Sequence, residues 1–350
     1  MRLMRIVTVI CWGIAAAALI GLAFWFLTGT IFGIRTQRMG SGGWRLNWQQ
    51  GLNFGGWGTL TGPFEEAGSH TAAVEGINSI DIDWISGGVR LMPYDGDVIK
   101  ITEFAQRSLS GNERMHITAS GGALQIRFTE SSFTNRVPQK RLEVLVPQAL
   151  SQSLGTLSAG NISGSVHIDG FDATTLRAKT TSGAIEISNS ASRTLSANSI
   201  SGSVNLSAAQ AGELAVGTTS GSITVAGSFD SAALESVSGR ISLANPAPDS
   251  ALDVKSTSGS LDVTGAFGRV DASTLSGSIN IKSTIVPSSC KVRSTSGSLT
   301  ITVPNEGPIP VYHSSTSGRF SSAVPVTMQG RGAQFELSTL SGSTRILALD

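Results

Sequence analysis

A Ser-Gly pair recurs along about half of the chain, and this repeat restricts the fold more than any other feature of the sequence. Related phrases surround the pair, such as TTSGAIEI, TTSGSITV, STSGSLDV and STSGSLTI. The repeat glycines, 18 to 24 residues apart, are Gly164, Gly183, Gly202, Gly221, Gly239, Gly259, Gly277, Gly297, Gly318 and Gly342. Repetition at this period is typical of solenoids, in which each unit packs on its neighbours.

Apolar and polar residues alternate within each unit. Two and four residues after the glycine the side chain is almost always aliphatic, as in Val166 and Ile168, and the residue between them is polar. A second apolar pair stands seven and five residues before the glycine, as in Leu176 and Ala178. A period of two indicates β-strands with one inward and one outward face. Each unit is therefore predicted to form two short strands with a corner at Ser-Gly, where glycine allows a conformation that other residues avoid.

One unit buries too few apolar side chains to offset the ordering of its backbone, so hydrogen-bonded stacking on neighbours must stabilise it. We predict an all-β fold: a β-solenoid, resembling a single-stranded β-helix, built from units of about 19 residues. Threonine alternates with an aliphatic residue two positions before the glycine, and Gly183, Gly221, Gly259 and Gly297 are each 38 residues apart. These features favour a coil of 38 residues with two similar halves over a coil of 19 residues.

The N-terminal part of the chain differs from the repeat. Residues 6–34 contain no charge, and as a helix they would span roughly 44 Å, more than the roughly 30 Å hydrocarbon layer of a bilayer. We expect a short tail (1–5), an uncleaved transmembrane helix (6–34), a Gly/Trp-rich linker (35–75), a degenerate start of the solenoid (76–150) and the regular solenoid (151–350). A cleaved signal peptide is the alternative for 6–34. Basic residues flank both ends of the span, so the expected extracytoplasmic position of the β domain rests on the short N-terminal tail.

Composition excludes several classes of function. The net charge of +1 does not favour nucleic-acid binding. The two cysteines cannot pair, because Cys11 lies in the apolar span and Cys290 in the repeats, where it occupies an inward position and is interpreted as a core residue. His313 occupies an adjoining inward position, and no second ligand has suitable spacing for a metal site.

The arrangement IDIDWISGGVRLMPYDGD, followed by TTSGAIEI, TTSGSITV and STSGSLDV, resembles the bacterial putative-adhesin family. This family is a β-strand-repeat domain of unknown function that is common in Gram-positive envelopes, and the resemblance covers roughly residues 76 to 350. It implies a β-solenoid-like domain, with some members linked to envelope stress responses. It supplies no catalytic residue.

No cluster of catalytic side chains stands out. The outward position three residues after the glycine has carboxylates only at Glu186 and Asp262, which would lie two coils apart in a 38-residue coil. Such a pair would suit an inverting glycosidase by distance alone. Outward threonines at Thr181, Thr219, Thr257 and Thr295 would form an edge row, which makes ice binding another alternative.

We therefore predict a protein that is not an enzyme, with no catalytic, cofactor-binding or metal-binding residues. Its expected role is a membrane-anchored envelope module for binding, adhesion or scaffolding, linked to stress sensing. Its partners would be the lipid bilayer, through residues 6–34, and an unidentified envelope polymer, peptide or protein, with no nucleic acid. The alternatives are a self-assembling stalk and a carbohydrate-active β-helix enzyme.

Overall fold

The computed structural model describes residues 64–129, 138–332 and 334–349, all within one compact unit, Gly55–Asp350. The predicted tail (1–5), the predicted membrane helix (6–34) and most of the predicted linker lie outside the described residues. Among the residues that are described, no helix is both long and apolar enough to cross a bilayer.

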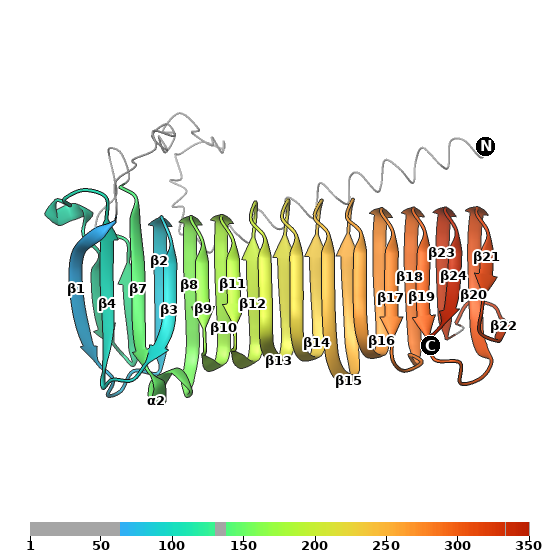
Figure 1. The fold of residues 1–350 in the computed structure, drawn as a ribbon, viewed down its shortest axis with the longest axis horizontal. Coiled ribbons are helices and arrows are strands. Elements are labelled where there is room, and N and C mark those ends of the chain that lie inside the picture. The colour runs from blue at the N-terminus through green and yellow to red at the C-terminus, as the bar shows by residue number, and fades with distance from the viewer. Residues whose placement is uncertain (1–63, 130–137, 333, 350) are drawn as a thin grey trace, which may run out of the picture. The chain divides into compact units, whose positions relative to one another are not determined.

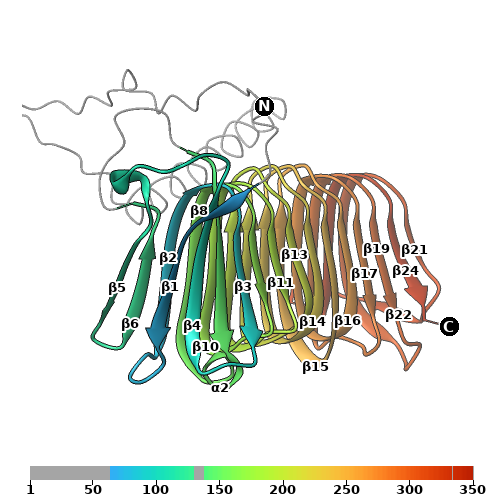
Figure 2. The same cartoon turned by 60° about the vertical axis from the view of Figure 1, so that its left-hand side comes forward.

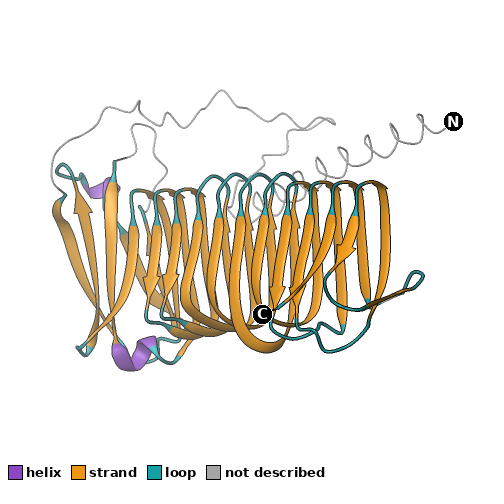
Figure 3. Ribbon diagram, turned by 45° about the vertical axis from the view of Figure 1, so that its right-hand side comes forward, coloured by secondary structure: helices purple, strands orange, loops and turns teal. Residues whose placement is uncertain are grey.

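The described residues are mostly β-strand, as Figure 3 shows, so the all-β prediction is confirmed. Two short helices, η1 (Gly111–Glu113) and α2 (Gln148–Ser151), lie near the N-terminal end. The strands are β1 (Glu65–Ala73), β2 (Ser79–Ser86), β3 (Val89–Tyr94), β4 (Val98–Ala105), β5 (His116–Ser120), β6 (Ala123–Arg127), β7 (Lys140–Pro147), β8 (Leu154–Ser163), β9 (Val166–Asp169), β10 (Asp172–Ser182), β11 (Ile185–Ser188), β12 (Ala191–Ser199), β13 (Val204–Thr218), β14 (Ile223–Ser236), β15 (Ile241–Ser256), β16 (Leu261–Ser276), β17 (Ile279–Ser283), β18 (Ser289–Ser296), β19 (Leu299–Val303), β20 (Ile309–Ser317), β21 (Phe320–Ser322), β22 (Val326–Met328), β23 (Phe335–Ser341) and β24 (Thr344–Ala348).

The strands build a flattened, solenoid-like stack with two faces (Figures 1 and 2). Face 1 contains the strands that precede each Ser-Gly pair, such as β8, β10 and β12, and face 2 contains those that follow it, such as β9 and β11. The long strands β13 to β16 run along face 2, bend, and continue along face 1. We call the edge with the Ser-Gly pairs the corner edge and the opposite one the bend edge; they are the upper and lower edges in Figure 1.

The register shows how much chain makes one coil. Leu176 of β10 lies opposite Leu157 of β8 on one side and Leu195 of β12 on the other, and Leu195 lies opposite Leu214 of β13. One Ser-Gly unit therefore makes one full coil, and the predicted 38-residue coil is wrong. The unequal unit lengths had favoured the 38-residue coil. The extra residues of the longer units lie at the bend edge, where the β14–β15 and β15–β16 pairings shift register.

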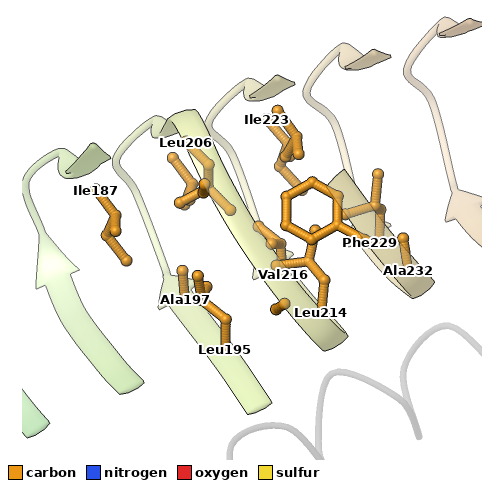
Figure 4. Packing of buried hydrophobic residues seen from close by; sticks show 14 of the residues in the cluster. Ile187, Leu195, Ala197, Leu206, Leu214, Val216, Ile223, Phe229 and Ala232 are labelled. Atoms are coloured by element: carbon orange, nitrogen blue, oxygen red, sulfur yellow. The ribbon is translucent and has the colours of Figure 1, made fainter. Parts of the chain in front are cut away.

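The alternating apolar side chains meet between the two faces. Leu195 and Ala197 from face 1 and Ile187 and Leu206 from face 2 are at most 2% exposed, and Figure 4 shows them gathered with their neighbours from adjacent coils. The same inward positions repeat in every coil, so the core is continuous along the stack. Cys290 lies in this core and is fully buried, as its interpretation as a core residue requires.

Two features hold the corner edge together. Each repeat glycine lies against the carbonyl of the glycine one coil earlier, so a Cβ on Gly202 would lie 1.6 Å from the Gly183 oxygen. The residue three before the glycine adds a hydroxyl or amide: the Thr218 hydroxyl donates to the Gly202 carbonyl (3.2 Å) and accepts from the Gly221 N–H (3.1 Å). This column was not predicted from the sequence, although every repeat has Ser, Thr or Asn there: Asn161, Thr180, Ser199, Thr218, Ser236, Ser256, Thr274, Ser294, Ser315 and Thr339.

At the N-terminal end the chain order and the spatial order differ. The β2–β3 coil stacks directly on β8 and β9, while β6 and β7 form the next layer outward. Residues 65–73, within the predicted linker, form strand β1, antiparallel to β4. Residues 116–127, within the predicted degenerate start of the solenoid, form the antiparallel hairpin β5–β6, and Gly121 and Gly122 take positive φ values of 59° and 78° in its turn.

A buried ion pair closes this end of the core. The Lys140 ammonium lies 2.6 Å from the Glu103 carboxylate, and the two side chains are 0% and 1% exposed. The ammonium also donates to the Phe128 carbonyl and lies 3.8 Å from the centre of the Phe128 ring. Burial lowers the pKa of Lys140, and the hydrogen bond to Glu103 opposes that shift.

The C-terminal end is also out of chain order. Strands β23 and β24, the last in the chain, lie between β18–β19 and β20–β21, so the coil of β20 and β21 is the outermost. Two of its inward positions are polar, since His313 lies opposite Leu337 and Ser322 lies opposite Ile346, whereas Val311 of the same coil remains apolar and buried. Strand β22 covers only the start of β20.

Candidate functional site

One row of outward side chains crosses face 2 from coil to coil. It contains the residues three positions after the repeat glycines, extended at the N-terminal end by Arg90 and Glu143, and the parallel register aligns them. From the N-terminal end, this outward row is Glu143, Arg90, His167, Glu186, Asn205, Thr224, Ser242, Asp262, Asn280, Thr300, Arg345 and Ser321. Neighbouring positions are about 4.8 Å apart, the separation of hydrogen-bonded strands.

The two predicted carboxylates of this row are not close together. Four register steps separate Glu186 from Asp262, which corresponds to about 19 Å. Glu186 instead accepts from His167 Nδ1 at 3.2 Å, and Asp262 accepts from the Asn280 amide at 2.8 Å. The prediction of an inverting glycosidase pair is therefore wrong, because it required Glu186 and Asp262 to lie only two coils apart.

The predicted threonine edge is also not formed. Because one unit makes one coil, Thr181 and Thr219 are separated by Ile200 along the corner edge. Further along, Val237 and Leu275 hold the aliphatic positions and are 42% and 44% exposed. A continuous threonine row, which ice binding needs, is absent from this edge.

A cleft opens at the N-terminal end of the outward row. Its volume is about 810 Å³, and its lining includes Phe64, Phe104, Arg141, Arg90, Glu143 and His167. Strands from distant parts of the sequence bring these residues together, since β3 lies between β7 and β9. The corner edge contributes Gly87 and Gly88 to the lining, where most repeats have Gly-Ser.

Aromatic rings and a guanidinium form one side of the cleft. The Arg141 guanidinium lies 4.0 Å from the centre of the Phe64 ring, a cation–π contact. Phe104 of β4 lies opposite Arg141 of β7, and both phenylalanines are half-buried. Their rings therefore offer apolar surface beside charged groups.

The charged side chains of the cleft balance one another. Arg90 lies opposite Glu143 on one side and His167 on the other. Within the described ranges neither Arg90 nor Glu143 forms a salt bridge, whereas His167 contacts Glu186. Two guanidiniums, Arg90 and Arg141, thus share the cleft with two carboxylates, so no single charge sign dominates it.

A second hollow, of about 640 Å³, lies on face 1 near the bend edge. Small and polar residues line it, with charges at Asp172, Arg193 and Asp230. No aromatic side chain lines this hollow, so it offers a ligand less apolar contact than the cleft on face 2.

Cys290 and His313, which were considered for covalent and metal chemistry, occupy inward positions of the coils. Burial raises the pKa of the Cys290 thiol to about 12, which leaves it a poor nucleophile. Burial lowers the pKa of His313, whose ring lies 4.9 Å from that of Phe320 at the outermost coil. Across the described part of the chain, no group of three or more His, Cys, Asp or Glu side chains could hold a metal ion.

The sequence analysis did not identify the cleft. Arg90 stands three residues after Gly87, as His167 does after Gly164, so the repeat template could have placed Arg90 in the outward row. No sequence pattern indicates that β7 pairs with β3, because backbone hydrogen bonds between strands do not depend on side-chain identity. Glu143 and Arg141 could therefore be assigned to the cleft only from the structure.

Comparisons with known proteins identify the family of the β domain. The family model described as Toastrack DUF4097 matches residues 77–264 and 228–344. Among solved structures, the chain is similar to a putative lipid binding protein from Parabacteroides distasonis ATCC 8503 (13% identity, TM-score 0.42, 80% of this chain and 96% of that chain). It is also similar to a putative adhesin from the same organism (12%, 0.41, 81% and 97%) and to one from Bacteroides fragilis NCTC 9343 (12%, 0.34, 80% and 96%). No curated protein matches the sequence.

The resemblance to a β-repeat family of unknown function is thus confirmed. The family model covers well over half of the chain, and the protein belongs to the Toastrack DUF4097 family.

Proposed function

We propose that this protein is a binding module of the cell envelope. Residues 6–34 hold it in the membrane, the β domain lies on the extracytoplasmic side, and face 2 captures an envelope polymer, peptide or protein. The observation that carries this proposal is the outward row, which the stacked coils hold at regular spacing and which opens into the cleft. A rigid, preorganised surface loses little conformational entropy when it binds a partner.

The proposed location in the membrane rests on the uncharged segment 6–34. Its length as a helix, roughly 44 Å, exceeds the thickness of the hydrocarbon layer. The large β domain follows it along the chain. This order suits a signal anchor that exports the C-terminal domain.

The ends of the stack favour binding over end-to-end assembly. A stalk would need an exposed apolar coil at its ends. The N-terminal end is instead closed by hairpin β5–β6 and by the Lys140–Glu103 ion pair. The C-terminal end has His313 and Ser322 at inward positions, which weakens its apolar surface.

Protease accessibility in intact cells, with a tag placed after Asp350, tests on which side of the membrane the β domain lies. Digestion of the domain without lysis is the expected result. Protection until the inner membrane is broken would overturn the proposed orientation and favour a scaffold beneath the membrane.

Co-sedimentation with isolated envelope material tests the binding face. Thr224 on face 2 and Ala215 on face 1 are both exposed and small, so tryptophan fits at either site. We expect Thr224→Trp to reduce retention and Ala215→Trp to leave it unchanged. Equal retention of both variants would contradict binding through face 2.

A further inference from the structure

We propose that the cleft on face 2, lined by Phe64, Phe104, Arg141, Arg90 and Glu143, binds an uncharged pyranose segment of an envelope glycan. This inference rests on the proposed function and names the class of ligand for it. The ligand is recognised by its ring faces and hydroxyl groups rather than by a net charge.

The polar lining suits hydroxyl groups. Each sugar hydroxyl donates one hydrogen bond and accepts others, so its binding site needs donors and acceptors side by side. Arg90 can only donate and Glu143 can only accept, and the register places them directly opposite each other on neighbouring strands. Neither forms a salt bridge within the described residues, although, besides the hydrogen bond from Ser188, the charge of Arg90 helps to lower the pKa of the nearby Asp169. Both line the cleft, where a ligand can meet them. Hydrogen bonds to such charged groups are stronger than those between neutral groups.

The balance of charge disfavours a strongly charged ligand. A carboxylate or phosphate placed near Arg90 and Arg141 would also lie near Glu143 and would be repelled by it. An ammonium placed near Glu143 would meet the two guanidiniums in the same way. A neutral ligand suffers neither penalty.

The aromatic side of the cleft suits the ring of a sugar. Phe64 and Phe104 are half-buried, and the Arg141 guanidinium packs on the Phe64 ring. Rigid aromatic side chains supply contact area at a low entropic cost. Apolar contact and hydrogen bonding therefore meet within one cleft of about 810 Å³.

The outward row provides a path for a longer chain. Beyond His167 and Glu186 it continues through Asn205, Thr224 and Ser242, all of which carry hydroxyl or amide groups. Their regular spacing of about 4.8 Å lets successive sugars meet equivalent side chains. The cleft would hold one end of the glycan and face 2 would support the rest.

Calorimetry on the full chain in detergent micelles tests the ligand class. The probes are neutral tetrasaccharides of β-1,4-linked glucose and N-acetylglucosamine, with polyglucuronate and polylysine as charged comparisons. We expect at least one neutral probe to bind with an affinity that changes little with salt. Binding to a charged probe alone, with strong salt dependence, would overturn the proposal.

Two variants that remove a charge separate the ligand classes further. Arg90→Gln and Glu143→Gln each replace a charged group with a neutral, polar amide. For a neutral glycan both changes weaken binding, by about tenfold or more for hydrogen bonds to charged groups. For an anion Glu143→Gln would instead strengthen binding, and for a cation Arg90→Gln would. Opposite effects of the two variants would therefore refute a neutral ligand.

A space-filling variant checks that the cleft is the site. A Cβ on Gly88 would meet nothing closer than the Ser165 hydroxyl at 3.7 Å, so the backbone accepts a side chain here, and a tryptophan would occupy part of the cleft that Gly88 lines. Ser203 holds the same position in another coil, and Ser203→Trp is the matched control. We expect Gly88→Trp to abolish binding of the neutral probe and Ser203→Trp to preserve it. Binding that survives Gly88→Trp would overturn the site, whereas the protease and envelope-binding results would still stand on their own.

Discussion

Replacement of Gly202 by alanine should separate two neighbouring coils. The new Cβ would lie 1.6 Å from the Gly183 carbonyl oxygen, whereas real Cβ atoms are essentially never closer than 3.0 Å to such an atom. The backbone would have to move by about 1.4 Å, since no flexible side chain can give way.

That displacement breaks the hydrogen bonds of Ser199, which stands between the two coils. Its hydroxyl donates to the Gly183 carbonyl (3.2 Å) and accepts from the Gly202 N–H (2.8 Å). A buried polar group left without its partner costs about 1–3 kcal/mol, so the two lost bonds correspond to about 2–6 kcal/mol.

Hydrogen exchange of backbone amides is the suitable assay, because the coils of a solenoid contact only their neighbours and the damage stays local. We expect amides near Gly183 and Gly202 to exchange at least roughly thirtyfold faster in Gly202→Ala. Gly88→Ala is the matched control, because its Cβ would meet only an ordinary contact at 3.7 Å. Unchanged protection in Gly202→Ala, or an equal loss in Gly88→Ala, would refute close backbone approach as the reason for glycine at the corners.

Three further predictions concern buried and paired groups. Lys140→Ala leaves the Glu103 carboxylate buried and unpaired, so the stability measured by denaturant should fall by about 3–5 kcal/mol; a loss below about 1 kcal/mol would contradict the burial of this pair. The Arg107 guanidinium lowers the pKa of Glu113 to about 2 from 4.5, so this pair stabilises the fold above pH 4.5 and its contribution is lost as the pH falls towards 2. The free energies of unfolding of the wild type and Glu113→Gln, measured as a function of pH, should therefore differ above pH 4.5 and become similar near pH 2. A difference that does not change with pH would argue against the pair. In a Cys11→Ser background, Cys290 should react with a thiol reagent at pH 8 only after unfolding, since burial raises its pKa to about 12; rapid labelling of the native protein would show that the core is open.

Much of the fold followed from the sequence alone. The alternation around each glycine predicted inward residues such as Ile187 and Leu195, and the interpretation of Cys290 as a core residue followed from the same template. These predictions succeed because burial imposes a period of two on every strand that faces the core. The corner glycines were also identified, although their reason is close approach to the preceding coil as much as backbone conformation.

The length of the coil needed the tertiary structure. Threonine and aliphatic residues alternate two positions before the glycine, as at Thr219 and Val237, and this alternation suggested 38 residues. The position lies on the corner edge, where Val237 is 42% exposed, so no core packing selects the residue there. The alternation therefore carries no information about which strands are neighbours.

The order of the coils at both ends was likewise decided by tertiary structure. Strand β7 joins β3 across the β4–β6 segment, and β23 and β24 enter the stack ahead of β20 and β21. Strands pair through backbone groups that every residue carries, so the repeat template marks which side chains point inward but does not specify which strand comes next. The cleft on face 2 arises from one such pairing, which brings Glu143 beside Arg90 although the two lie far apart along the chain.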